Sequence, residues 1–285
     1  MIASLGELFQ RYNGYAYAGF NVFGYEDAKA VLEGAEECQT PVILMINRDA
    51  ASYIPLDLIG PLLNRMAQKA RVPVAVHLDH AVSLEAIRMA CECGFSSVMF
   101  DGSQLSMEEN IERTLQTIRI ARREGISVEA EIGSVGYSDP AVHAKQAYTE
   151  PEDAKRFYEA TKVDCLAVSV GTVHRMTTQS VTIQYERLHR IQRAVSVPLV
   201  IHGASSVANE DLTELSREGI RKINLGTCLR MAFGNTLRYT LAQMPEEFDR
   251  IKLFQASIGE TRREAIHKIR LLQPSLMTQS GAAVI

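Results

Sequence analysis

The sequence has no long apolar run and no dense basic segment, and each absence excludes a class of function. None of its apolar stretches reaches the roughly 18 residues that a membrane-spanning helix needs. The segment from Met1 to Tyr17 has no basic start followed by a long apolar stretch, so no leader peptide is expected. The chain has 30 Lys and Arg against 34 Asp and Glu residues, a net charge of −4, and no basic patch suited to nucleic acid or anionic lipid. We therefore expect small-molecule ligands and neither nucleic acid nor a membrane as partner.

Cysteines and linker segments are also sparse. The five cysteines lack the spacing of a disulfide framework, and their odd number indicates a reducing compartment, so we expect a cytoplasmic protein. No stretch rich in Pro, Gly or Ser divides the chain. With 46% hydrophobic and 22% charged residues, the composition is that of an ordinary globular protein. Residues 1–285 are therefore predicted to form a single domain.

Short runs rich in Val and Ile alternate along the chain with segments of helical periodicity. The runs are apolar at successive positions, which is typical of parallel strands covered on both faces. Eight such strands with intervening helices predict an α/β fold, a single (β/α)8 TIM barrel with an additional C-terminal helix. An open doubly wound sheet is the alternative, and the lack of a G-x-G-x-x-G motif disfavours it. The predicted strands span residues 19–23, 42–46, 74–78, 97–100, 127–132, 165–170, 199–202 and 222–225.

Two segments between the strands carry a helix-start signal. Ser106 with Glu109 and Thr149 with Glu152 match the capping box, in which a hydroxyl and a carboxylate each accept an N–H group of the first helical turn. The other predicted helices span residues 25–37, 56–70, 83–93, 185–194, 208–218, 227–243 and 259–272.

Polar residues stand where the apolar strands end. The carboxyl ends of barrel strands converge on one mouth, so residues distant in sequence become neighbours there. Three histidines among these residues are able to fill three positions of a catalytic metal site; hydrogen-bonded structural histidines are the alternative. His77 shares a strand face with Asp79 and is assigned to the core or to the surroundings of the site. The strand-end residues are Asn21, Asp79, His80, Asp101, Glu131, His174, His202 and Asn224.

Two glycine-containing turns follow the seventh and eighth predicted strands. The sequence reads His-Gly-Ala-Ser-Ser over residues 202–206 and Asn-Leu-Gly-Thr over residues 224–227. Loops after these two strands, ending at helix N-termini, form the usual phosphate site of such barrels. Either turn alone is explained by a tight turn with a helix cap, but their occurrence at adjacent strands favours an anion site.

Together, these segments resemble the class II, metal-dependent ketose-bisphosphate aldolases, the family of fructose- and tagatose-bisphosphate aldolases. The resemblance extends over nearly the whole chain, and its motifs are specific in order and spacing. It implies a carbon–carbon lyase that reversibly cleaves a ketose (bis)phosphate or a related anionic ketose. The products would be dihydroxyacetone phosphate, or a similar three-carbon ketone, and an aldehyde, with a Zn²⁺-stabilised enediolate between them. The matching segments span residues 19–22, 76–80, 98–103, 129–133, 166–174, 201–205 and 223–227.

The resemblance also implies roles for individual residues. Asp79 would be the acid/base residue, and Asp101 and Glu131 would lie beside the metal or coordinate it transiently. A homodimer or homotetramer is implied as well. The metal ligands would be His80, His174 and His202, which accept Zn²⁺ and also other divalent ions. The substrate-binding residues would be Asn21, Ser103, Arg175, Gly203, Ser205, Asn224 and Thr227.

Some positions depart from the family pattern. In relatives, an acidic residue on the loop after the fifth strand moves a proton at the enediolate carbon; here Asp139 is the one carboxylate after Gly136 and Tyr137. Arg175 replaces a Gly near the phosphate, and its guanidinium suits phosphate, carboxylate or sulfonate; an arginine facing solvent is the alternative. Because the three histidines and Asp79 are intact, we prefer a zinc aldolase acting on an unusual ketose. A non-catalytic sugar-phosphate-binding or stabilising subunit and a metal-dependent hydrolase or decarboxylase are the alternatives.

Overall fold

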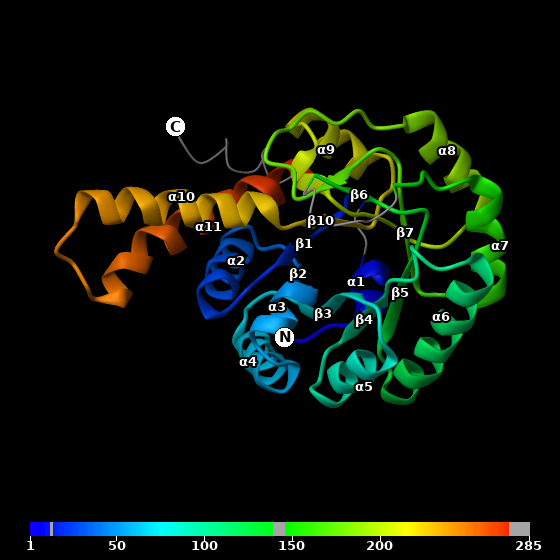
Figure 1. Ribbon diagram of the computed structural model, residues 1–285, viewed down its shortest axis with the longest axis horizontal. Helices are drawn as coiled ribbons and strands as arrows, with labels where there is room; N and C mark the ends of the chain where they lie inside the picture. The colour runs from blue at the N-terminus through cyan, green and yellow to red at the C-terminus, as the bar shows by residue number, and fades with distance from the viewer. Residues whose placement is uncertain (12–13, 139–145, 274–285) are drawn as a thin grey trace.

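Eight parallel strands close into a barrel that the helices surround (Figure 1). The computed structural model describes residues 1–11, 14–138 and 146–273. Each barrel strand pairs with the next barrel strand along the chain, and the last pairs with the first. The predicted TIM barrel is therefore confirmed. Its strands are β1 (Tyr17–Asn21), β2 (Val42–Ile46), β3 (Val74–Ala81), β4 (Ser97–Phe100), β5 (Ser127–Ile132), β7 (Cys165–Val168), β9 (Leu199–Ile201) and β10 (Lys222–Leu225).

The helices lie outside the barrel, as predicted, and the last helix is longer than its sequence pattern indicated. It begins at Arg250 instead of residue 259. Asp249 caps this start by accepting the N–H group of Ile251. Two short helices were not predicted, α1 (Leu5–Gln10) and α3 (Arg48–Tyr53). The others are α2 (Tyr25–Glu37), α4 (Leu56–Lys69), α5 (Leu84–Glu92), α6 (Met107–Ala121), α7 (Pro151–Thr161), α8 (Tyr185–Ala194), α9 (Asn209–Arg217), α10 (Thr227–Gln243) and α11 (Arg250–Leu272).

One of the two predicted capping boxes is present. Ser106 and Glu109 form both reciprocal hydrogen bonds at the start of α6. The prediction for Thr149 was wrong, because its hydroxyl donates to the carbonyl of Ile132 and accepts the N–H group of Ser169. Thr149 thus joins the loop after β5 to the end of β7, and no side chain of the described residues caps the start of α7.

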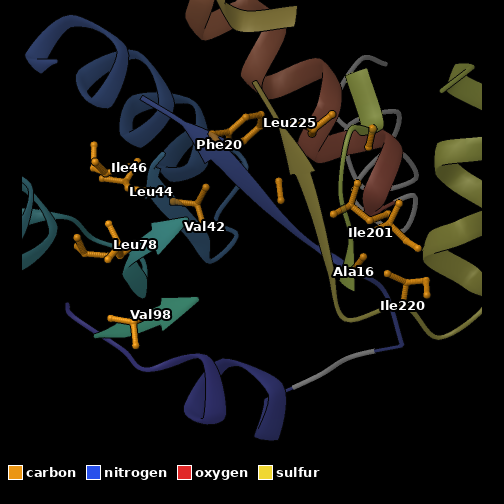
Figure 2. Close-up of a cluster of buried hydrophobic side chains, with 14 of the residues drawn as sticks. Ala16, Phe20, Val42, Leu44, Ile46, Leu78, Val98, Ile201, Ile220 and Leu225 are labelled. Carbon is orange, nitrogen blue, oxygen red and sulfur yellow. The ribbon is translucent and has the colours of Figure 1, made fainter. Parts of the chain in front are cut away.

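Apolar side chains fill two regions on either side of the barrel wall. The larger lies between strands and helices, and Figure 2 shows part of it, with Phe20, Leu44 and Ile201 among its labelled residues. The smaller lies inside the barrel, where Leu5 and Leu8 of α1 pack with residues such as Ile43 and Val200. Helix α1 thereby closes the end of the barrel at which the strands begin. The polar residues occupy the opposite end.

Helices α10 and α11 form an arm that extends away from the barrel (Figure 1). The second half of α11 packs on α2, where Gly34 lies close to Ala265 and Ile266. The far end of the arm exposes large apolar side chains, with Phe248 92% and Ile251 81% exposed. No helix of the described residues is both long and apolar enough to span a bilayer, and all five cysteines are free thiols.

A glycine in the loop after β7 is expected to be essential for stability. Gly171 has a φ of +117°, and a Cβ atom there would lie 2.3 Å from the carbonyl oxygen of Thr182. Gly219 also has a positive φ, +81°, but no atom that the structure describes, apart from its two chain neighbours, lies within 4 Å of its added Cβ. We expect Gly219→Ala to cost roughly 1–2 kcal/mol from backbone strain alone. Gly171→Ala should cost about 1–3 kcal/mol more because it also forces a clash. Equal losses in urea unfolding would contradict this.

Candidate metal and anion site

Strand β3 directs two consecutive residues, Asp79 and His80, toward the barrel mouth. In a regular strand, consecutive side chains point to opposite faces. Here the pairing of β3 with β4 shifts register between Leu78 and Ala81, and His80 has a φ of 54°. A bulge of this kind re-aims a side chain. Asp79 and His80 therefore line the same cavity, although simple alternation places them on opposite faces.

The other two candidate histidines reach the site in different ways. His202 directly follows β9, at a barrel strand end as predicted. His174 lies six residues beyond the end of β7, in the short strand β8 (Val173–His174), so its predicted position at a barrel strand end was wrong. Strand β8 pairs in parallel with β6 (Gly136–Tyr137), and the rings of Tyr137 and His174 stack with centroids 4.7 Å apart. This two-stranded sheet holds His174 at the site.

Nitrogen atoms of the three imidazole rings converge on one point. One ring nitrogen from each of His80, His174 and His202 lies within 4.8 Å of the others. The Nδ1 of His80 is 2.8 Å from Asp101, and the Nε2 of His202 is 2.8 Å from Glu129. A carboxylate only accepts, so each of these nitrogens carries a proton, and the other nitrogen of each neutral ring keeps its lone pair.

Two of these nitrogens face each other. The Nε2 of His80 and the Nδ1 of His202 lie 3.0 Å apart, a contact that requires either a proton on Nε2 of His80 or a metal cation beside both nitrogens. The Nε2 of His174 is buried and has no hydrogen-bond partner among the described residues. Tetrahedral zinc binds imidazole nitrogens at about 2.0–2.1 Å, which places the nitrogens roughly 3.3 Å apart. The three rings thus fit a divalent ion.

Carboxylates adjoin the three rings. Glu131 has one oxygen, Oε2, that is buried, has no hydrogen-bond partner in the described part of the chain and lies 3.6 Å from Nδ1 of His202. Glu131 and Asp101 also form a second potential ligand group with His80, again within 4.8 Å. Burial and the charge of Asp101 raise the pKa of Glu131 to about 8. Burial lowers the pKa of His80, but the charges of Asp79, Asp101 and Glu131 outweigh burial and raise it well above its ordinary value.

Asp79 is almost fully buried and remains an ionised group. Its Oδ1 lies 4.0 Å from Nε2 of His80 and accepts the amide N–H of Asn224 at 3.3 Å. Burial alone would raise its pKa, but the surrounding cationic groups, His80 first, hold it below its ordinary value. A carboxylate held beside the converging nitrogens is suited to receive a proton from a bound substrate.

A cavity that is partly open to solvent lies over these residues. An adjoining cavity shares His80 and His174 with it. Ser103 lines this second cavity, where its hydroxyl donates to Asp101 at 2.7 Å. The other predicted substrate-binding residues line the first cavity: Asn21, Arg175, Gly203, Ser205, Asn224 and Thr227.

One wall of the first cavity suits an anion. The Oγ of Ser205 accepts the N–H groups of Gly226 and Cys228, each at 3.3 Å, which leaves its hydroxyl proton to donate. Helix α10 begins at Thr227, so its N-terminal N–H groups lie at the same wall. Gly203 has a φ of +64°, and a Cβ there would lie only 2.9 Å from the carbonyl carbon of Val173. A glycine is therefore required for the backbone to approach so closely.

Arg175 lines the same cavity and is paired with a carboxylate. Its guanidinium forms a 2.6 Å ion pair with Asp49 on α3, a helix that the sequence analysis missed, and lies 5.8 Å from the ring centroid of Tyr137. About a third of its side chain is exposed. Two further arginines that were not predicted, Arg48 and Arg230, line the same cavity. The cavity mouth is thus more cationic than the motifs indicated.

Two buried residues below the histidines were also missed. Lys222 and Glu129 form a 2.7 Å ion pair, and both side chains are fully buried. The signal was present in the sequence, because each stands two residues before a predicted site residue and so shares its strand face. Asp139, predicted to act in proton transfer, lies outside the described residues, so that role stays a prediction. The described part of its loop ends at Ser138, whose N–H group donates to the carbonyl of His174.

Comparison with known proteins gives one consistent family. The family model for class-II fructose-bisphosphate aldolase matches residues 7–275. The YdjI aldolase of Escherichia coli K12 is 33% identical, with a TM-score of 0.82 over 95% of this chain and 97% of that one. A putative fructose-1,6-bisphosphate aldolase of Coccidioides immitis is 26% identical, with a TM-score of 0.83 over 97% of each chain. The fructose-bisphosphate aldolase of Campylobacter jejuni, 24% identical over 95% of each chain, shares the fold with a TM-score of 0.81.

Uptake of a divalent ion at the three histidines should release protons. Because the pKa of His80 lies well above its ordinary value, the metal-free site holds a proton at pH 7 that a metal must displace. Zinc affinity should then fall by about tenfold per pH unit below neutrality for each proton released. Titration calorimetry in buffers of different ionisation enthalpy counts these protons, and we expect at least one at pH 7. Binding without proton release would contradict the assigned charges.

Proposed function

Because the chain belongs to the class-II fructose-bisphosphate aldolase family, we propose that it is a metal-dependent aldolase, a carbon–carbon lyase acting on an anionic ketose. The observation that carries the proposal is the convergence of three imidazole nitrogens beside the buried carboxylate of Asp79. A cavity with an anion-binding wall opens directly over them. Metal, base and anion site are the three parts that ketose cleavage requires.

His80, His174 and His202 are assigned as ligands of one divalent ion, and zinc is the preferred candidate. When bound, such an ion polarises the ketose carbonyl and stabilises the negative charge of the enediolate left by bond cleavage. Asp101 orients His80 through the hydrogen bond to Nδ1. The free oxygen of Glu131 lies close enough to the rings to approach the ion. Imidazole ligands also accept Co²⁺, Fe²⁺ or Mn²⁺.

The wall formed by Gly203, Ser205 and Thr227 is assigned to the phosphate of the three-carbon ketone product. Ser205 donates its hydroxyl proton there, and the first turn of α10 supplies backbone N–H groups. Asn21 and Asn224 each have a buried side-chain oxygen without a partner among the described residues. Both oxygens are available to accept substrate hydroxyl groups between the phosphate and the histidines.

Asp79 is assigned the proton transfer of the cleavage step. In cleavage it takes the proton from the hydroxyl that becomes the aldehyde, and in condensation it returns that proton. The amide of Asn224 donates to Asp79 and fixes the direction of its carboxylate. Arg175, together with Arg48, places positive charge at the cavity mouth, where phosphate, carboxylate or sulfonate would be accepted. Ser103 acts through Asp101, to which its hydroxyl donates.

Substitutions should separate metal binding from proton transfer. His174→Ala removes a ligand nitrogen, so we expect loss of both zinc and lyase activity. Asp79→Ala removes only the base, so zinc should remain while turnover falls by about 10²–10⁴-fold. His189→Ala, in a helix-surface histidine paired with Glu218, is the control and should change neither. Zinc content by atomic absorption and turnover of ketose phosphates are the measurements, and equal zinc loss in His174→Ala and Asp79→Ala would refute the assigned roles.

The free thiols and the exposed arm bear on location and assembly. Five free cysteines suit a reducing compartment, and the cytoplasm remains our assignment.

Exposed apolar patches mark contact surfaces. The far end of the arm, with Tyr239 67%, Phe248 92% and Ile251 81% exposed, supports a homodimer or homotetramer joined through this region.

The arm can be tested as a contact between subunits. Phe248→Glu with Ile251→Glu places charge on the exposed apolar end, so the assembled form should dissociate toward monomers. Tyr53→Glu, at a site 78% exposed on α3, is the control and should leave the mass unchanged. Light scattering coupled to size exclusion gives the mass, and a wild-type protein that is monomeric at micromolar concentration would contradict the proposed assembly.

A further inference from the structure

A layer of polar side chains crosses the barrel interior one strand repeat below the site. His77, Glu129 and Lys222 stand two residues before Asp79, Glu131 and Asn224 on their strands, so they point inward at the next level down. Ser97 of β4 and the ring of His202 complete the layer. None of the five side chains in the layer is exposed to solvent. Buried polar groups cost free energy unless each is hydrogen-bonded.

The ammonium group of Lys222 can only donate hydrogen bonds. This fixes which group donates and which accepts in the other hydrogen bonds of the layer. The Nζ of Lys222 lies 2.7 Å from Oε2 of Glu129 and 3.4 Å from Nε2 of His77. His77 therefore presents a lone pair at Nε2 and donates its Nδ1 proton to Ser97 at 2.8 Å. The other oxygen of Glu129, Oε1, is left to accept the Nε2 proton of His202 at 2.8 Å.

The direction of the last bond decides which nitrogen His202 offers to the site. With Nε2 protonated toward Glu129, the lone pair sits on Nδ1, which faces His80 at 3.0 Å. Without the ammonium group, Glu129 is a buried carboxylate with no counter-charge from Lys222, and Oε2 keeps the weak S–H donor of Cys165, whose Sγ lies 3.6 Å away. The rotation of Glu129, and with it the acceptor that orients the ring of His202, is then fixed less firmly.

We propose that Lys222 is a positioning residue of the metal site, which acts through Glu129 to hold Nδ1 of His202 toward the ion. The inference rests on the proposed function in one respect, that the three histidines bind a metal. It goes beyond that function because Lys222 is fully buried below the site and lines neither of the two cavities described above. Outer partners of metal ligands typically set metal affinity.

The test is Lys222→Met, which keeps most of the side-chain length and removes the charge. Zinc affinity of the folded full-length variant is measured by competition with a chromophoric chelator, and we expect it to be about 10–100-fold weaker than in the wild type. Cobalt gives a second readout. The visible spectrum of Co²⁺ at the site should change in Lys222→Met, because one of its imidazole ligands is no longer held in orientation.

Lys268→Met is the matched control, since it also removes a buried lysine. Lys268 is 3% exposed and lies on α11, where Nζ contacts Asn209 at 3.0 Å and Glu264 at 3.7 Å, away from the histidines. This variant should lose thermal stability while its zinc affinity stays within about twofold of the wild type. The comparison separates a positioning role from a general loss of packing.

Two measurements decide the matter if Lys222→Met does not fold. Glu129→Gln keeps the size of the side chain, but its amide can satisfy only one of His202 and Lys222, so zinc affinity should again fall. In the zinc-bound wild type, nitrogen-15 NMR should show Nδ1 of His202 bound to the metal and Nε2 protonated. Metal at Nε2 of His202 would overturn the inference.

The outcomes distinguish this inference from the proposed function. A wild type that binds zinc, together with a folded Lys222→Met that binds it as tightly, overturns the positioning role and leaves the aldolase proposal standing. Equal loss of zinc affinity in Lys222→Met and Lys268→Met also overturns it. A wild type that takes up no zinc contradicts both proposals.

Discussion

The structure depends on the way three imidazole rings are held with their lone pairs turned toward one another. Two of the rings owe this to a carboxylate bound at the opposite nitrogen, Asp101 for His80 and Glu129 for His202. In the metal-free site a proton on His80 takes the place of the metal cation, so Nε2 of His80 donates to Nδ1 of His202. The closed barrel keeps the rings in this arrangement through the apolar layers on both sides of its wall.

The barrel also places apolar, charged and metal-binding side chains at different levels along its axis. Helix α1 closes one end of the barrel with apolar side chains, so water does not reach the charged groups inside the barrel from that end. The polar layer of Lys222 and Glu129 lies next, and the histidines and Asp79 lie above it, under an open cavity. The buried charges of Glu129 and Lys222 thus each have a partner of opposite sign, which is the condition for tolerating them.

Much of this was predictable from sequence, and the exceptions have physical causes. Strands that are buried on both faces are apolar at successive positions, and this pattern predicted the barrel. It also predicted that His202 and Asn224 lie at strand ends. The pairing of Asp79 with His80 depends on a bulge and a positive φ at His80, which no periodicity indicates. His174 is placed by a short sheet that forms only through contacts distant in sequence. Thr149 fitted a capping box, but its hydroxyl found backbone partners in two other segments.

The metal-binding account can be tested most directly by anomalous X-ray diffraction at the zinc edge, from crystals of the wild-type protein grown with zinc. The account predicts one strong peak enclosed by Nε2 of His80, Nε2 of His174 and Nδ1 of His202, at about 2.0–2.1 Å from each nitrogen. A map without a peak among these three atoms, or with the zinc held only by other residues, would contradict it.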